Sequence, residues 1–299
     1  MPRTFLWPRI VLTGRNGQVG WELQRTLAPL GEVVALDRRQ LDLSRPDQIR
    51  ERVREIKPSL IVNAAAYTAV DRAEEEPELA MAVNGVAPGI LAEEARRLNA
   101  VMVHYSTDYV FDGTKTTPYT EEDEPRPLNV YGKTKLEGER AIQAVGLPHL
   151  ILRTGWVYGM RGKNFLLTIL RLAKERDELK IVDDQIGAPT WSRTIAEVTA
   201  QILKANASPV TDLSDIYHLT ASGSTSWYGF AKAILELDPN RAEQVCRQPK
   251  PILTAEYPTP ARRPAHSVLP NAKLKAAFGI VLPGWEQSLK LALEKDKDE

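Results

Sequence analysis

Short apolar runs alternate with longer amphipathic stretches through the first half of this 299-residue chain. Runs such as RIVLT and LIVNA are rich in β-branched residues, which favours strands that are buried on both faces. The stretches between them carry apolar residues at helical spacing, which favours amphipathic helices. We therefore predict strands at 9–13, 32–37, 60–64, 101–106 and 149–154, and helices at 18–30, 46–56, 77–98 and 131–145.

This alternation predicts an α/β fold, because strands joined by helices of this length form right-handed crossovers in a doubly wound parallel sheet. After Trp156, prolines and glycines interrupt the pattern in segments such as DDQIGAPT and YPTPARRPAH. We expect residues 1–160 to form a first domain. Residues 161–299 should mainly form a smaller second domain, with pieces around 190–220 returning to the first.

The charge and the cysteine content of the chain limit which kinds of binding partner and which cellular compartment are expected. The chain carries 39 basic and 39 acidic residues, so it has no net positive field that would attract nucleic acid or an anionic membrane. Cys246 is its only cysteine, which excludes an internal disulfide. No apolar stretch has the length of a signal peptide or a membrane span, so we expect a cytoplasmic protein.

A glycine turn joins the first predicted strand to the first predicted helix. In GRNGQVG the glycines are Gly14, Gly17 and Gly20. Glycine permits a sharp turn and lets a pyrophosphate approach the helix N-terminus, where free N–H groups favour negative charge. The second predicted strand ends in Asp37, about twenty residues further on, where an acid that reads the ribose is expected. These features predict a Rossmann-type domain that binds NAD(P).

The choice between NADH and NADPH stays open. Asp37 can accept a hydrogen bond from the adenosine 2′-hydroxyl, which favours NADH. Arg38 and Arg39 follow at once and can pair with a 2′-phosphate, which favours NADPH.

Tyr131 and Lys135 have the i, i+4 spacing that places two side chains on one face of a helix. A nearby ammonium favours the phenolate, so we expect Lys135 to lower the pKa of Tyr131. Thr107 lies at the predicted end of the fourth strand, where ligands bind in open parallel sheets. The three residues predict the active site of a reductase or dehydrogenase.

The chain resembles the extended short-chain dehydrogenase/reductase family, and within it the dTDP-4-dehydrorhamnose reductases. The resemblance rests on motifs that run from near the N-terminus to about residue 264, namely GRNGQVG, NAAAYT, STDYVF, YGKTK, RTGWVYG, DDQIGAPT and YPTPARRP.

The resemblance implies roles for individual positions. The cofactor would be bound by Gly14, Gly17, Gln18, Val19, Gly20, Asp37, Arg38, Asp42, Leu43, Ala65, Ala66, Thr68, Tyr131 and Lys135. The catalytic residues would be Tyr131 as general acid, Lys135 as its electrostatic partner and Thr107. The substrate would contact Thr107, Asp108, Trp156 and Arg263, with Arg262 as a second candidate for the diphosphate.

The reaction that the resemblance implies is reduction of the 4-keto group of dTDP-4-dehydro-6-deoxy-L-mannose to dTDP-L-rhamnose, with hydride from NADPH or NADH. Some members of the family form a magnesium-bridged dimer, and Glu22 matches one acidic position. Arg193 stands where a further carboxylate is expected, so we predict no metal site and a monomer or weak homodimer.

Two alternatives to this reductase remain. One is a non-catalytic NADP-binding subunit similar to the regulatory subunit of methionine adenosyltransferase. The other is a nucleotide-sugar epimerase or dehydratase, although the glutamate that follows Thr-Asp in the dehydratases is replaced here by Tyr109.

Overall fold

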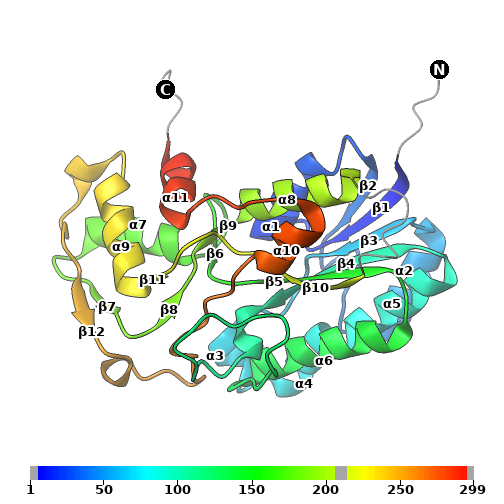
Figure 1. Cartoon of the computed structure of the whole chain (residues 1–299), viewed down its shortest axis with the longest axis horizontal. Coiled ribbons are helices and arrows are strands. Elements are labelled where there is room, and N and C mark those ends of the chain that lie inside the picture. Colours follow the sequence, from blue (N-terminus) through cyan, green and yellow to red (C-terminus); the bar gives the residue numbers. More distant parts are fainter. Residues whose placement is uncertain (1–5, 206–213, 295–299) are drawn as a thin grey trace.

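A six-stranded parallel sheet forms the centre of the computed structural model, which describes residues 6–205 and 214–294 (Figure 1). Every pairing within this sheet is parallel. In spatial order the strands are β2 (Gly31–Leu36), β1 (Trp7–Thr13), β3 (Leu60–Asn63), β4 (Val101–Thr107), β5 (His149–Thr154) and β10 (Asp215–His218). The strand order reverses at β1, so the carboxyl ends of β1 and β3 flank the crevice in which such sheets bind ligands.

Helices cover both faces of the sheet, as the doubly wound prediction requires (Figure 1). One face carries α1 (Gln18–Thr26), α8 (Ser192–Ala205) and α10 (Ala272–Phe278). The other face carries α2 (Pro46–Ile56), α5 (Ala87–Arg97) and α6 (Val130–Val145). The predicted α/β Rossmann-type fold is confirmed.

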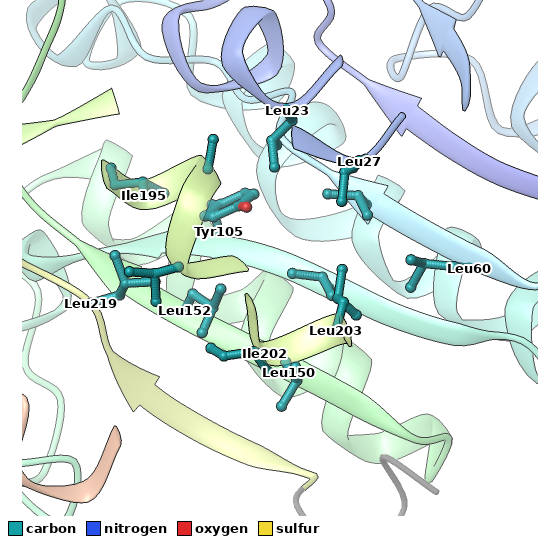
Figure 2. Close-up of a cluster of buried hydrophobic side chains, with 14 of the residues drawn as sticks. Leu23, Leu27, Leu60, Tyr105, Leu150, Leu152, Ile195, Ile202, Leu203 and Leu219 are labelled. Atoms are coloured by element: carbon teal, nitrogen blue, oxygen red, sulfur yellow. The ribbon is translucent and has the colours of Figure 1, made fainter. Parts of the chain in front are cut away.

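Alternate residues of each strand point to opposite faces, which divides the apolar side chains into two cores. In β1, Ile10 and Leu12 belong to the core under α1 and α8, whereas Val11 belongs to the core under α2 and α5. Figure 2 shows the first core, where Leu23 of α1, Leu27 directly after it, and Ile195, Ile202 and Leu203 of α8 lie over the strands.

A second lobe lies beside the sheet (Figure 1). Its own apolar core includes Phe230 and Trp285 and is built from α7 (Phe165–Glu175), α9 (Trp227–Leu237) and α11 (Trp285–Leu293). Short strand pairs complete it: β7 (Lys180–Val182) with β12 (Lys250–Ile252), β8 (Ile186–Gly187) with β11 (Thr225–Ser226), and β6 (Val157–Tyr158) with β9 (Thr190–Trp191). Short helices occur at α3 (Val70–Ala73), α4 (Pro77–Met81), η1 (Ala82–Val86), η2 (Asp108–Val110), η4 (Arg241–Glu243) and η5 (Thr254–Glu256).

The chain passes between the sheet and the second lobe repeatedly. After β6 and α7 it returns to the sheet in α8 and β10, then forms α9, and returns once more in α10 before α11. We therefore propose a division into two lobes that no single cut in the sequence separates.

Two predicted helices differ from the structure. The helix predicted over 18–30 ends at Thr26, and a turn in which Leu30 N–H donates to Leu27 C=O contains Pro29, which cannot continue a helix. The helix predicted over 77–98 is interrupted by the π-helical turn η1, where Ala87 N–H bonds the carbonyl of Ala82. Pro88 follows and has no N–H for an ordinary helical bond, so the ladder shifts there.

Candidate active site

A cavity of about 570 Å³ opens at the carboxyl edge of the sheet, between the glycine turn and helix α6. Most of the residues predicted to bind the cofactor line it: Gly14, Gly17, Gln18, Val19, Asp37, Arg38, Asp42, Leu43, Ala65, Ala66, Thr68, Tyr131 and Lys135. Gly20, Thr107, Asp108, Trp156 and Arg263 lie outside this lining.

The glycine turn leaves no room for side chains at two of its positions. Gly14 has φ +73°, and a Cβ added there would lie 2.8 Å from the carbonyl oxygen of Ala64. A Cβ on Gly20 would lie 2.1 Å from the carbonyl oxygen of Gly14. Gly17 caps α1 without a side-chain hydrogen bond, so the first N–H groups of this helix face the cavity. This cradle fits a pyrophosphate, which needs backbone donors at close approach.

Gln18 holds the start of α1 to the chain that follows β5. Its Nε2 donates to Val157 C=O at 3.2 Å, and its Oε1 accepts from Asn164 Nδ2 at 2.8 Å. The segment that it holds brings Gly162 and Lys163 to the cavity wall. Sequence reasoning missed both residues, since only tertiary contacts bring this loop to the cofactor site.

The residues that follow β2 present a carboxylate and a cation to the same cavity. Asp37 Oδ1 accepts from the backbone N–H groups of Arg39 and Gln40, at 2.9 and 3.2 Å. Arg38 lines the cavity and Arg39 does not. The Arg38 side chain is 75% exposed and its only ion pair in the described part of the chain is a 3.6 Å contact with Asp42, so it is available to a 2′-phosphate.

Tyr131 lies in the first turn of α6 and is fixed there by its neighbours. Asn129 caps the helix by accepting from Gly132 N–H at 2.8 Å. A side chain on Gly132 would collide with the carbonyl oxygen of Tyr109, which is why glycine follows Tyr131. The ring of Tyr109 meets that of Tyr131 edge-on, with centroids 5.9 Å apart.

The pKa of Tyr131 departs from the prediction. Burial raises it to about 12, and the neighbouring Thr107 hydroxyl only partly opposes this. The expectation that Lys135 lowers the pKa of Tyr131 is wrong for this structure, because Lys135 is itself buried and bonded to other groups. At neutral pH Tyr131 therefore holds the proton that a general acid donates, and its raised pKa makes it a weaker acid than a free tyrosine.

Lys135 lies one helical turn after Tyr131 and is only 2% exposed. Its Nζ donates to the carbonyl oxygen of Tyr105 at 2.6 Å and lies 3.0 Å from His104 Nε2. Burial lowers the pKa of Lys135 to about 8, and the carboxylate of Glu139 opposes that change.

Thr107 and Asp108 lie behind Tyr131, at the end of β4. Thr107 Oγ1 donates to Asp108 Oδ1 at 3.1 Å and accepts from Tyr109 N–H at 3.1 Å. Asp108 is 2% exposed, and burial raises its pKa to about 6. The two residues form one buried polar group in contact with Tyr131. The spacing of these residues in the sequence did not reveal this contact.

Ser106 and Thr154 add two unsatisfied hydroxyls to the cavity. Both side chains line it, and within the described residues their buried oxygens have no hydrogen-bond partner. Buried polar groups are normally paired, so these hydroxyls are suited to bond a bound molecule.

Trp156 marks the passage from β5 to the second lobe. Its φ is +49°, and its ring stacks on Trp227 with centroids 3.5 Å apart and planes 3° from parallel. Gly187 permits this placement, because a Cβ there would lie 2.4 Å from the indole of Trp156. Trp227 comes from α9 and was not predicted.

Arg263 is already paired with a carboxylate. Its Nη2 and Nη1 donate to the two oxygens of Asp71 at 2.8 and 3.0 Å, and Nη1 also donates to Ala261 C=O at 3.0 Å. Arg262 is exposed, and its carbonyl accepts from Asn129 Nδ2. Contact of either arginine with a diphosphate stays a prediction, and the pairing with Asp71 was not predicted.

Glu22 lies close enough to Arg193 to affect it electrostatically, and Arg193 pairs with Glu197 at 2.8 Å. Within residues 6–205 and 214–294, no group of three or more His, Cys, Asp or Glu side chains is arranged to hold a metal ion. None of the helices in the described ranges has the length and apolar character needed to cross a membrane.

Known proteins resemble the chain over nearly its full length. Residues 8–297 match the family model described as the RmlD substrate binding domain. A dTDP-4-dehydrorhamnose reductase from Burkholderia thailandensis is 52% identical over 291 residues, which cover 95% of this chain and 98% of that protein.

Two crystal structures show the same arrangement of elements. A dTDP-4-dehydrorhamnose reductase from Clostridium acetobutylicum superposes with a TM-score of 0.88 at 39% identity. The enzyme of the same name from Bacillus anthracis, solved in complex with NADP, superposes with a TM-score of 0.87 at 35% identity. Each comparison covers 95% of this chain and 98% of the other.

Proposed function

The chain belongs to the dTDP-4-dehydrorhamnose reductase family, and from this we propose that it reduces dTDP-4-dehydrorhamnose to dTDP-L-rhamnose with NADPH or NADH. One observation of the site carries the proposal: Tyr131 and the buried Lys135 line the same cavity as the glycine cradle. Reduction of a carbonyl by hydride uses such a combination, since a proton donor must lie near the nicotinamide to protonate the developing alkoxide.

The reduced nicotinamide supplies the hydride when it is bound, and the protein supplies the proton and the positioning. Tyr131 donates its phenolic proton to the oxygen that develops charge at C4 of the sugar. The Thr107 hydroxyl contacts the Tyr131 hydroxyl and so helps to hold the phenol in place. Lys135 presents its ammonium to the same cavity, where the ribose of the cofactor is expected.

Both cofactors are accommodated by the end of β2. Asp37 and Arg38 both line the cavity, so Asp37 would accept from a ribose 2′-hydroxyl and Arg38 would pair with a 2′-phosphate. The NADP complex of the Bacillus anthracis relative supports NADPH as one of them.

The alternatives are distinguished by turnover and cofactor exchange. Incubation of the protein with NADPH and dTDP-4-dehydrorhamnose should consume the reduced nicotinamide and yield dTDP-L-rhamnose, identified by mass and NMR spectra. A regulatory NADP-binding subunit would leave both unchanged. An epimerase would retain its cofactor through purification and isomerise a sugar nucleotide without net oxidation of NADPH.

We propose the cytoplasm as the place of action and a monomer or weak homodimer as the state of assembly. The single cysteine and the lack of net charge support a protein of a reducing compartment that acts on small molecules.

A further inference from the structure

Behind Lys135, buried polar side chains form a chain that the mechanism above does not use. Lys135 Nζ lies 3.0 Å from His104 Nε2, and His104 Nδ1 lies 3.0 Å from the amide nitrogen of Asn63. Thr13 Oγ1 lies 2.6 Å from Asn63 Oδ1 and accepts from Ala65 N–H at 3.2 Å. The chain crosses β4, β3 and β1 beneath the cavity, and its four side chains are each at most 2% exposed.

The hydrogen-bonding capacity of each group sets the direction of this chain. An ammonium can only donate, so His104 Nε2 must accept from a charged Lys135. The neutral ring then carries its proton on Nδ1 and donates it to Asn63. Rotation of the Asn63 side-chain amide by half a revolution places its oxygen against His104 Nδ1 and its nitrogen against Thr13 Oγ1. Burial and the charge of Lys135 hold the pKa of His104 well below its usual value, which keeps the ring neutral.

We propose that His104 is a positioning residue, which orients Lys135 and holds it in its charged form. His104 takes one ammonium hydrogen and the carbonyl of Tyr105 takes a second at 2.6 Å. The third hydrogen is thereby directed to the cavity that Lys135 lines, where the ribose of the cofactor is expected. The inference deepens the proposed function, because it rests on the role given there to Lys135.

Among the residues that the structure describes, few other titratable or charged groups lie near Lys135. Helix α6 contributes Tyr131 and Glu139, β4 contributes His104, and the Arg153 of β5 is paired with Glu139. Glu139 favours the ammonium and burial opposes it. A hydrogen bond from a charged donor is stronger than one between neutral groups, so loss of the His104 acceptor should favour the neutral amine.

Two polar substitutions of His104 distinguish the effect of its hydrogen bond to Lys135 from the effect of changing a buried side chain. His104→Gln places an amide oxygen near the position of Nε2 and can still accept from Lys135. His104→Asn is one bond shorter, keeps the contact on the Nδ1 side and cannot reach Lys135. His149→Asn is the control, because His149 is also a buried histidine but its Nδ1 contacts only the carbonyl of Leu147.

Dissociation constants for NADPH, measured by fluorescence from pH 6 to 10 (roughly the range around the Lys135 pKa), give a readout that needs no sugar substrate. Wild-type binding should weaken as the pH rises through the pKa of Lys135. His104→Asn should move this midpoint down by roughly one pH unit, whereas His104→Gln and His149→Asn should stay within roughly 0.3 of wild type. The alkaline limb of kcat/KM should shift in the same way.

Equal midpoints for His104→Asn and His104→Gln would overturn the proposal. If His104→Asn does not fold, Asn63→Asp decides: a carboxylate against Nδ1 makes Nε2 a better acceptor, so the midpoint should rise, and an unmoved midpoint refutes the role. Failure of the wild type to reduce the 4-keto sugar would refute the proposed function, while the NADPH titration would still test His104.

Discussion

The buried ion pair between Glu139 and Arg153 gives a sharp test of what holds α6, and with it Tyr131, on the sheet. Arg153 Nε and Nη2 donate to the two Glu139 oxygens at 3.0 and 2.7 Å, and the side chains are 2% and 1% exposed. Glu139→Gln keeps the shape of the side chain and removes its charge. Arg153 cannot lose its proton, so the variant leaves an uncompensated buried cation.

Removal of one partner from a buried pair costs about 3–5 kcal/mol of unfolding free energy. At roughly 2–4 °C per kcal/mol for a chain of this size, the melting temperature should fall by at least about 6 °C. Glu137→Gln is the matched control, since Glu137 lies on the same helix and pairs with Arg140 at 2.7 Å, but is 45% exposed. Exposed pairs contribute about 0–1 kcal/mol, so the control should melt close to wild type.

Calorimetry and urea unfolding of the two variants measure this difference directly. The double variant Glu139→Leu with Arg153→Met should recover most of the loss, because an apolar pair removes both charges together. If Glu139→Gln and Glu137→Gln unfold within about 1 kcal/mol of each other, burial does not control the energy of these pairs and the reasoning fails.

Three further outcomes follow from the site. Tyr131→Phe should lower kcat by roughly 10²–10⁴-fold, the range for loss of a general acid, while NADPH still binds; near-wild-type turnover would remove Tyr131 from the mechanism. Asp37→Asn keeps an acceptor for the turn N–H groups of Arg39 and Gln40 but loses the charge. Titrations should therefore show that NADH binding is weakened by roughly tenfold relative to NADPH binding. Equal effects on the two cofactors would show that Asp37 does not read the ribose. EDTA should change neither the molar mass by light scattering nor the activity, because Arg193 would repel a cation near Glu22; a dimer that dissociates in EDTA contradicts this.

The sheet could be predicted from local pattern because its strands are short, apolar and separated by helices. The strand predicted at 149–154 coincides with β5, and the glycine turn and the Tyr131–Lys135 spacing are themselves local features. The predicted helices were wrong near prolines: α1 ends before Pro29, earlier than predicted, and Pro88 follows the π-helical turn that interrupts the second helix.

What the sequence did not reveal depends on contacts between distant segments. Lys163 lines the cavity next to Asn164, whose side chain bonds the distant Gln18, and Arg263 meets Asp71 across 192 positions of the chain. Burial, too, is a property of the folded chain. The pKa of Tyr131 is therefore raised where the nearby lysine alone suggested that it would be lowered.

The late position of β10 in the chain has a consequence for synthesis and truncation. A polypeptide that stops at residue 160 contains β1 to β5 but lacks β10, α8 and α10, so one side of β5 has no neighbouring strand and Leu150 and Leu152 lose their cover. An uncovered apolar edge is a template for pairing with other chains. The growing chain can complete its sheet only once residues 215–218 have been made, which leaves nascent and shortened forms of this protein prone to aggregation.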